Sequence, residues 1–388
     1  RKLLSASISG TTLEVGADAP GDNISITFDG GTGQVDVDVA GTVSTFDPAN
    51  FDTIQVTGGS GDNDLFLDGA VIPTNGVSFD GNGGTFDALR LQNGSFTTIT
   101  HNLDASTSGS VDLDGQIGAV TYTNLTNAVT DALTATNRIF NFNGSGLLNG
   151  RIENLADGQT RIGSTGQSQT INFNNPTSTF EVNLTGNDDV MTVVSLGWGW
   201  DAISSTINAG DGRDQIFLNA TDADTIGGAN TTGASPWTVN GQGGNDGLKL
   251  AGSSGVSGNL SDLDDGVTFN GGADHDQFLI YDDGNVAGDT YSVTETTVTS
   301  LGWTTEGGGP GATYDATVEH VHLYTGDNLD TFNVHSVNAS GSMSVDSGAG
   351  NDYLVAYTSA TTSLSGLSFW AGTGYDEMEL NGTATEVT

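Results

Sequence analysis

The chain alternates apolar and polar residues in short runs, and glycine-rich turns separate the runs. The clearest example is the stretch 237–250, Trp-Thr-Val-Asn-Gly-Gln-Gly-Gly-Asn-Asp-Gly-Leu-Lys-Leu. Val239 belongs to the alternation before the turn, Asp246 follows the glycines, and Leu248 and Leu250 resume the alternation. Alternation with a period of two predicts strands with one buried face, and the glycines permit the positive φ angles of a tight turn. We therefore expect strand, turn, aspartate and strand, in that order.

The same pattern recurs from one end of the chain to the other, with an aspartate after each turn. Neighbouring copies are 22 to 32 residues apart, and the two longer intervals are close to four and two such periods. In the first copy Asp64 is out of phase by one residue, and Asn63 holds the register instead. The nine aspartates are Asp64, Asp87, Asp189, Asp214, Asp246, Asp276, Asp330, Asp352 and Asp376. A period of about 25 residues is typical of solenoids.

These patterns predict an all-β fold, since helical periodicity is almost absent and glycine and β-branched residues are dense. We expect a parallel β-solenoid, or β-helix, with Gly- and Asp-rich turns. Tandem β-sandwich domains are the alternative, because short strands between frequent turns suit both folds. The expected organisation is N-terminal strands that form a cap or an assembly segment in 1–57, a repetitive β-solenoid in 58–380 with side loops near 197–237 and 281–320, and a polar C-terminal tail in 381–388.

Charge narrows the range of partners. The chain has 48 acidic and 8 basic residues, and its formal net charge is −40. Nucleic acid and anionic membranes are therefore excluded as expected partners, and the repulsion calls for salt or divalent cations. There is no cysteine, so no disulfide framework is possible. No apolar stretch approaches the length of a membrane span, and we expect none.

Two copies of the turn carry the motif most completely, 348–354 (Gly-Ala-Gly-Asn-Asp-Tyr-Leu) and 241–248 (Gly-Gln-Gly-Gly-Asn-Asp-Gly-Leu). They resemble the haemolysin-type calcium-binding repeat, GGxGxDxUx, of secreted bacterial RTX proteins. In that family tandem nonapeptides wind into a β-roll whose aspartates and turn carbonyls cage Ca²⁺. The resemblance implies Ca²⁺ as a cofactor at the nine aspartates, although this chain carries one motif per 22 to 32 residues.

Stacking of the repeats bears on the same question. Equivalent aspartates on successive coils would lie about 5 Å apart and form one column of carboxylates, which a bridging Ca²⁺ would stabilise. The alternative is that each aspartate hydrogen-bonds to the amides of its own turn and binds no ion.

The first six residues, Arg-Lys-Leu-Leu-Ser-Ala, resemble the tail of the LEPRxLLSA segment found near the N-terminus of many exported bacterial proteins. The resemblance implies a processed, exported protein. We accordingly expect an extracellular or cell-surface location.

Two further groups of residues are candidates for binding. Four tryptophans in irregular segments either stack on glycans or partners, or cover the side of the solenoid: Trp198, Trp200, Trp237 and Trp303. His320 and His322 share a strand face beside Glu319, where they form either a metal site or an ordinary surface pair.

The function that we expect is that of an extracellular structural protein, which self-assembles into a filament, fibre or surface layer stabilised by Ca²⁺. A rod of similar coils has matching strand edges at its two ends, and end-to-end stacking propagates. A Ca²⁺-dependent adhesin that binds glycans is the alternative. A polysaccharide lyase or hydrolase is disfavoured, because the few basic residues form no constellation and paired aspartates such as 188/189 and 282/283 are common in so acidic a chain.

Overall fold

The all-β prediction is confirmed by the computed structural model, in which the only helices among the described residues are two short 3₁₀ turns, η1 (Pro48–Asn50) and η2 (Gly69–Val71). The structure describes residues 5–17, 21–114, 118–156, 158–196, 200, 203–219, 236–252, 257–260, 263, 266–301, 311–358 and 364–382. The chain forms two compact units. Unit 1 comprises Arg1–Gly146 and Gly158–Asn183, and unit 2 comprises Leu147–Asp157 and Leu184–Thr388.

Unit 1 contains strands of two sheets, A and B. The strands of sheet A are β1 (Ser5–Ser9), β2 (Thr12–Gly16), β6 (Thr53–Thr57), β8 (Val77–Asp80), β10 (Ser95–Ala105), β11 (Ser108–Leu113), β12 (Val120–Thr123), β14 (Thr134–Phe142) and β18 (Thr179–Asn183). Those of sheet B are β3 (Asn23–Asp29), β4 (Gln34–Val39), β5 (Thr42–Phe46), β7 (Asp64–Asp68), β9 (Ala88–Gln92), β13 (Val129–Asp131), β16 (Gln159–Ser164) and β17 (Ile171–Asn174).

Pairing in unit 1 is mixed. The first strands form antiparallel hairpins, β1 with β2 and β3 with β4 and β5. Further along, β2, β6, β8 and β12 pair in parallel in sheet A, while β3, β7, β9, β13 and β17 do so in sheet B. The segment 1–57, expected to cap or to assemble, thus contributes its hairpins to both sheets of unit 1.

Unit 2 is the more regular unit. Its sheet A strands are β20 (Ser204–Asn208), β22 (Trp237–Asn240), β24 (Val267–Asn270), β26 (Thr290–Val293), β27 (Thr297–Ser300), β28 (Ala312–Tyr314), β30 (Thr331–Val334), β32 (Tyr353–Thr358) and β34 (Glu377–Gly382). Its sheet B strands are β15 (Asn149–Ala156), β19 (Val190–Ser195), β21 (Gln215–Leu218), β23 (Gly247–Leu250), β25 (Gln277–Asp282), β29 (His320–Thr325), β31 (Ser342–Asp346) and β33 (Leu367–Trp370).

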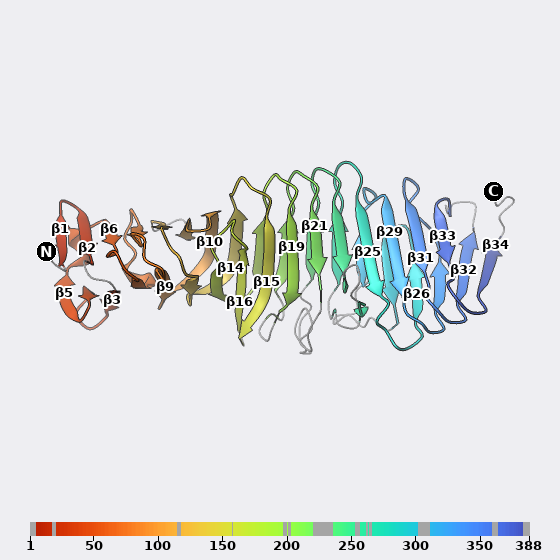
Figure 1. Ribbon diagram of the computed structural model, residues 1–388, viewed down its shortest axis with the longest axis horizontal. Helices are drawn as coiled ribbons and strands as arrows, with labels where there is room; N and C mark the ends of the chain where they lie inside the picture. The colour runs from red at the N-terminus through yellow and green to blue at the C-terminus, as the bar shows by residue number, and fades with distance from the viewer. Residues whose placement is uncertain are drawn as a thin grey trace. The chain divides into compact units, whose positions relative to one another are not determined.

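In unit 2 the chain passes back and forth between the sheets, and each strand pairs in parallel with the equivalent strand of the next repeat. In sheet B, β19, β21, β23, β25, β29 and β31 follow one another in this way and lie side by side (Figure 1). The segment 281–320, where we expected a side loop, contributes β26, β27 and β28 to sheet A, with β27 antiparallel to both neighbours.

The period-two alternation builds the core. In β22 the side chains of Trp237 and Val239 are buried, whereas those of Thr238 and Asn240 are half-buried on the outer face. The register keeps this order from repeat to repeat, since Val239 lies opposite Phe269 in the parallel pair β22–β24. Burial of one apolar face per strand is the main favourable contribution to folding.

Candidate functional site: the aspartate turns

The turn that leads into sheet B of unit 2 places its aspartates in a continuous chain of hydrogen bonds. The backbone N–H of Asp189 donates to Oδ1 of Asp214 (2.7 Å), that of Asp214 to Asp246 (2.8 Å) and that of Asp246 to Asp276 (2.8 Å). The backbone N–H of Asp276 in turn donates to Oε2 of Glu319 at 2.8 Å. We call these five acids the B-side ladder. Each carboxylate therefore holds the backbone of the preceding repeat.

A second chain of the same kind lies in the turns that lead into sheet A. The N–H of Asp289 donates to Oδ1 of Asp330 (2.8 Å), that of Asp330 to Asp352 (2.9 Å) and that of Asp352 to Asp376 (3.0 Å). We call these four residues the A-side ladder. The sequence predicted one column of aspartates, whereas in unit 2 they form two ladders that precede different sheets.

Unit 1 has a shorter version of this arrangement in the turns before sheet B. The N–H of Asn63 donates to Oδ1 of Asp87 at 2.9 Å, and the N–H of Asp87 donates to the hydroxyl of Thr126 at 2.9 Å. Asp64 is the first residue of β7 and forms an ion pair with Arg90 at 3.2 Å. Asn63 thus takes the ladder position, as the register of the sequence indicated.

The residue before the ladder position makes a bond in the opposite direction. Oδ1 of Asp188 accepts the N–H of Arg213 in the next repeat at 2.9 Å. Asn245 and Asn351 do the same for the residues that precede the next ladder aspartates, with distances of 3.0 and 2.9 Å. The pair of polar residues at the end of the motif therefore binds the backbone of both neighbouring repeats. In this arrangement the acceptors serve the adjacent turns, not only their own.

Glycine is required where the carboxylate packs against the turn. A Cβ atom on Gly241 would lie 2.7 Å from Oδ2 of Asp246 and 2.1 Å from the carbonyl oxygen of Gly271. Gly244 has φ +119°, and a Cβ there would lie 1.5 Å from the carbonyl oxygen of Gly212. Both positions exclude any larger residue, which explains the Gly-rich part of the motif.

The second carboxylate oxygen of several ladder residues is buried and lacks a hydrogen-bond partner in the structure. These atoms are Oδ2 of Asp87, Asp214, Asp246, Asp276 and Asp352. Burial raises the pKa of Asp214 to about 8, that of Asp246 to about 7 and those of Asp276 and Asp330 to about 6. Backbone N–H bonds to Oδ1 oppose this rise, and neighbouring carboxylates add to it. A buried carboxylate without a compensating charge favours its neutral form.

The ladder hydrogen bonds engage carboxylate oxygens that a Ca²⁺ cage would need. Calcium takes six to eight oxygen ligands, several of them carboxylates. In both ladders Oδ1 of the aspartates already accepts a backbone N–H from the preceding turn. No group of three or more His, Cys, Asp or Glu suited to a metal occurs among the residues that the structure describes. Calcium at the nine aspartates stays a prediction.

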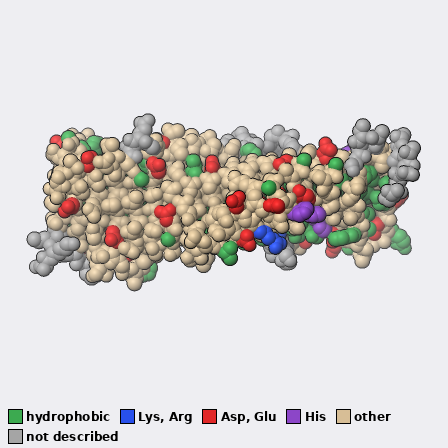
Figure 2. Space-filling model, turned by 90° about the horizontal axis from the view of Figure 1, so that it is seen from above, with side chains coloured by type: hydrophobic (Ala, Val, Ile, Leu, Met, Phe, Trp, Pro, Cys, Tyr) green, Lys and Arg blue, Asp and Glu red, His purple; other side chains and the backbone are tan. Residues whose placement is uncertain are grey.

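His320 and His322 lie on the outer face of β29 in sheet B. The rings of His275 and His320 are stacked with centroids 6.3 Å apart, and Nδ1 of His320 lies 2.7 Å from the Ser342 hydroxyl oxygen. Figure 2 shows histidine side chains gathered at one place on the face in view. His322 instead stacks on Tyr324 at 3.8 Å, and burial lowers its pKa. The pair His320 and His322 therefore makes ring and hydroxyl contacts rather than a shared metal centre.

Two of the four tryptophans can be placed. Trp200 and Trp237 are fully buried, and the indole N–H of Trp200 donates to the hydroxyl of Ser205 at 3.1 Å. Of the two alternatives for these rings, the structure supports packing over exposure to glycans for both, because they fill the core. Trp198 and Trp303 lie outside the described residues.

Sequence reasoning missed a buried charge cluster in unit 1. Oδ2 of Asp131 lies 2.9 Å from Nε2 of His101 and also accepts from Nη1 of Arg138, and all three side chains are fully buried. Burial raises the pKa of Asp131, but the charge of Arg138 and the His101 hydrogen bond outweigh this and hold it below its usual range. A charged residue at an inward position of an alternating run, as at Arg138 in β14, is the signal that would have found the cluster.

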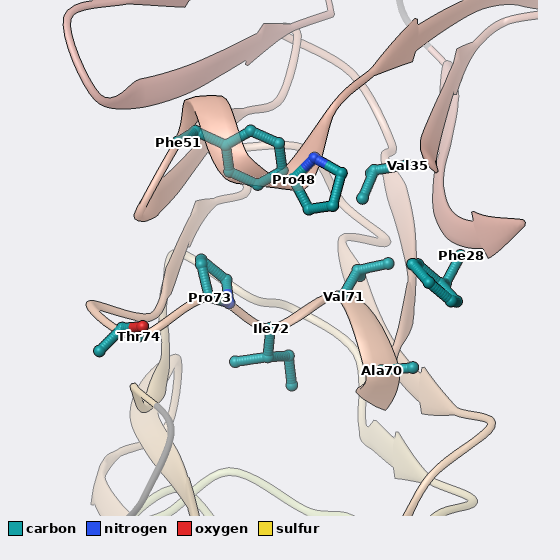
Figure 3. Close-up of a pocket in the computed structure, with 9 residues that line it drawn as sticks. All are labelled: Phe28, Val35, Pro48, Phe51, Ala70, Val71, Ile72, Pro73 and Thr74. Atoms are coloured by element: carbon teal, nitrogen blue, oxygen red, sulfur yellow. The ribbon is translucent and has the colours of Figure 1, made fainter. Parts of the chain in front are cut away.

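An apolar pocket of about 150 Å³ opens in unit 1 between the hairpin of β3 and β4 and the segment around η2 (Figure 3). Phe28, Val35, Phe51 and Val71 are among its lining residues, and Thr74 is the only one with a polar side chain. The lining offers no titratable group, so it has no evident catalytic chemistry.

No protein-family model matches the chain, and a comparison with curated proteins gave no match. Among the described residues, no helix is long and apolar enough to cross a membrane.

Proposed function

We propose that the chain is an extracellular structural protein, in which the paired strands of each unit are coils of a parallel β-solenoid and copies associate through the strands β33 and β34. The proposal rests mainly on the exposure of β34. Met378 and Leu380 are 52% and 47% exposed, although the register places them beside Leu354 and Ala356, which are fully buried. Within the part of the chain that the structure describes, no strand covers these inward-facing apolar residues.

The strand edges also favour association through β33 and β34. Among the described strands, β34 pairs only with β32, and β33 pairs only with β31. Free backbone N–H and C=O groups on an exposed edge form a template for another strand. Trp370 at the end of β33 adds an exposed ring. A second copy of the chain would cover these residues and continue the parallel pairing, which is the kind of contact that propagates.

The N-terminal segment and the net charge are consistent with this proposal. The resemblance of the first six residues to a segment of exported bacterial proteins supports export. The net charge of −40 opposes close contact between copies at low ionic strength, so assembly is expected to increase with salt. A glycan-binding adhesin is not favoured, because two of the tryptophans expected to contact sugars lie in the core.

The test is electron microscopy and sedimentation velocity of the full chain in 0.5 M NaCl, with millimolar Ca²⁺ and again after chelation. The variant Met378→Lys/Leu380→Lys should abolish filaments or sheets. The control Ser368→Lys/Asn381→Lys adds the same charge at exposed, outward positions of β33 and β34 and should leave assembly intact. Discrete particles of the unaltered chain under all conditions would rule out the proposal.

A further inference from the structure

One ladder position is occupied by asparagine, and it shows what the site accepts. A Cβ atom on Gly58 would lie 2.9 Å from Nδ2 of Asn63 and 2.9 Å from the carbonyl oxygen of Gly81. The same construction on Gly241 gives 2.7 Å to Oδ2 of Asp246 and 2.1 Å to the carbonyl oxygen of Gly271. Oδ2 of the aspartate therefore occupies the place that Nδ2 takes in the asparagine.

The two side chains use that place differently. Nδ2 of Asn63 has carbonyl acceptors in Gly59 (3.1 Å) and Gly81 (3.4 Å), and it lies 3.0 Å from Oδ1 of Asp87. Oδ2 of Asp246 is an acceptor atom that is buried and has no hydrogen-bond partner in the structure. Asn63 is as deeply buried as the aspartates, so the difference is chemical rather than a matter of exposure.

We propose that the ladder position is a hydrogen-bonding site between repeats to which an asparagine amide is better fitted than a carboxylate, and that it takes no Ca²⁺. The position needs an acceptor for the N–H of the preceding repeat and a donor toward the turn carbonyls, and an amide supplies both. A cation would need further oxygen ligands, whereas the glycine Cα atoms pack directly against the carboxylate of Asp246 and that of Asp276. This inference is independent of the proposed assembly.

The experiment compares urea unfolding of the full chain with Asp246→Asn and Asp246→Ala at pH 7.5, in EDTA and in 2 mM Ca²⁺. Asp246→Asn should raise the urea midpoint, because it keeps the acceptor for the Asp214 N–H and adds the missing donor. Asp246→Ala should lower the midpoint, because it removes that acceptor. The urea midpoints of the unaltered chain and of both variants should be the same in EDTA and in 2 mM Ca²⁺.

The control Asp188→Asn removes one negative charge from the same kind of turn at a residue that already serves as a simple acceptor. A gain for Asp246→Asn that exceeds the gain for Asp188→Asn supports the inference. Equal gains in the urea midpoint would overturn the inference, because the loss of one negative charge would then explain the stabilisation of both variants. A lower urea midpoint for Asp246→Asn than for the unaltered chain would also overturn the inference. So would a midpoint of the unaltered chain that rises with Ca²⁺ while the midpoint of Asp246→Asn does not.

Calorimetric titration of the unaltered chain with CaCl₂ gives a second readout that does not depend on a variant folding. No saturable binding is expected. Saturable binding that Asp246→Asn or Asp276→Asn abolishes would assign the ladder to calcium and contradict the inference.

Discussion

The backbone N–H of Asp214 and the Oδ1 atom of Asp246, 32 residues apart in the sequence, are joined by a hydrogen bond of 2.8 Å. Both residues are buried, so water cannot replace either partner at low cost. Because Asp246 uses its own N–H in the same way toward Asp276, each bond is one step of a chain that orders successive turns. The aspartate of the repeat is thus a structural residue first.

Stability should fall as the pH rises from about 4 to about 8. Burial raises the folded-state pKa of Asp214 to about 8, that of Asp246 to about 7 and that of Asp276 to about 6. An acid whose pKa is higher in the folded chain binds more protons when folded, so the free energy of unfolding decreases with pH across this window. Urea unfolding at half-unit pH steps measures this decrease. Each acid contributes at most about 1.4 kcal/mol to the free energy of unfolding per pH unit.

The Asp246→Asn variant should show a shallower decline over the same pH range, since one of the titrating acids is removed. Stability that instead rises between pH 4 and 8 would contradict the raised pKa values.

Replacement of Gly244 by alanine should destabilise unit 2 by at least about 2 kcal/mol, because strain at positive φ adds to a clash with the carbonyl oxygen of Gly212. Gly186→Ala is the matched control, since its nearest neighbour would be the Asp211 Cβ at 3.9 Å and its φ is not in the left-handed region. Thermal unfolding followed by circular dichroism distinguishes the two variants. Equal losses would mean that the turn has room for a Cβ.

Removal of the Arg138 guanidinium from the buried cluster of unit 1 should be among the single substitutions that lower the free energy of unfolding most. Arg138→Met leaves Asp131 buried beside His101 without its charge partner, and we expect a loss of about 3–5 kcal/mol. Adding Asp131→Asn should recover part of that loss, because the uncompensated charge is then gone. A double-mutant cycle from urea unfolding measures the coupling, and strictly additive losses would show that the pair does not interact.

The outer face of sheet A in unit 2 carries a row of asparagines whose amides bind one another. Nδ2 of Asn240 donates to Oδ1 of Asn208 at 2.7 Å, and Asn270 donates to Asn240 at 2.8 Å. Asn240→Ala breaks both bonds, and because the row is only half-buried we expect a loss of about 1–2 kcal/mol. Thr238→Val, on the same face of the same strand, is the control and should change the midpoint little. No loss for Asn240→Ala would mean that water replaces the row.

Much of this fold follows from local patterns in the sequence. The alternation around Asp246 predicts β22 and β23 and the turn between them, and the phase of the apolar residues separates Asn63 from Asp64. These features depend on residues close together in the chain. Local periodicity and turn chemistry therefore suffice to find them.

The division into two ladders could not be read in this way. The interval between Asp276 and Asp330 looks like two periods, but it contains the strands β26 to β28, after which the aspartate precedes sheet A instead of sheet B. Glu319 keeps the B-side position, and an acid directly before the alternating run of β29 was its signal. The buried, unpartnered oxygen of several ladder aspartates depends on packing between distant repeats, which no local pattern reports.

The opposed bonds made by the adjacent residues Asp188 and Asp189 have a consequence for how such a chain can change over time. Asp188 accepts an N–H of the following repeat and Asp189 accepts one of the preceding repeat, so these bonds hold successive repeats together at the corner. The stretch between two corners can then gain or lose residues without shifting the strands on either side, as the unequal intervals of 22 and 32 residues illustrate. We therefore expect insertions between two corners to be accommodated better than insertions within a corner.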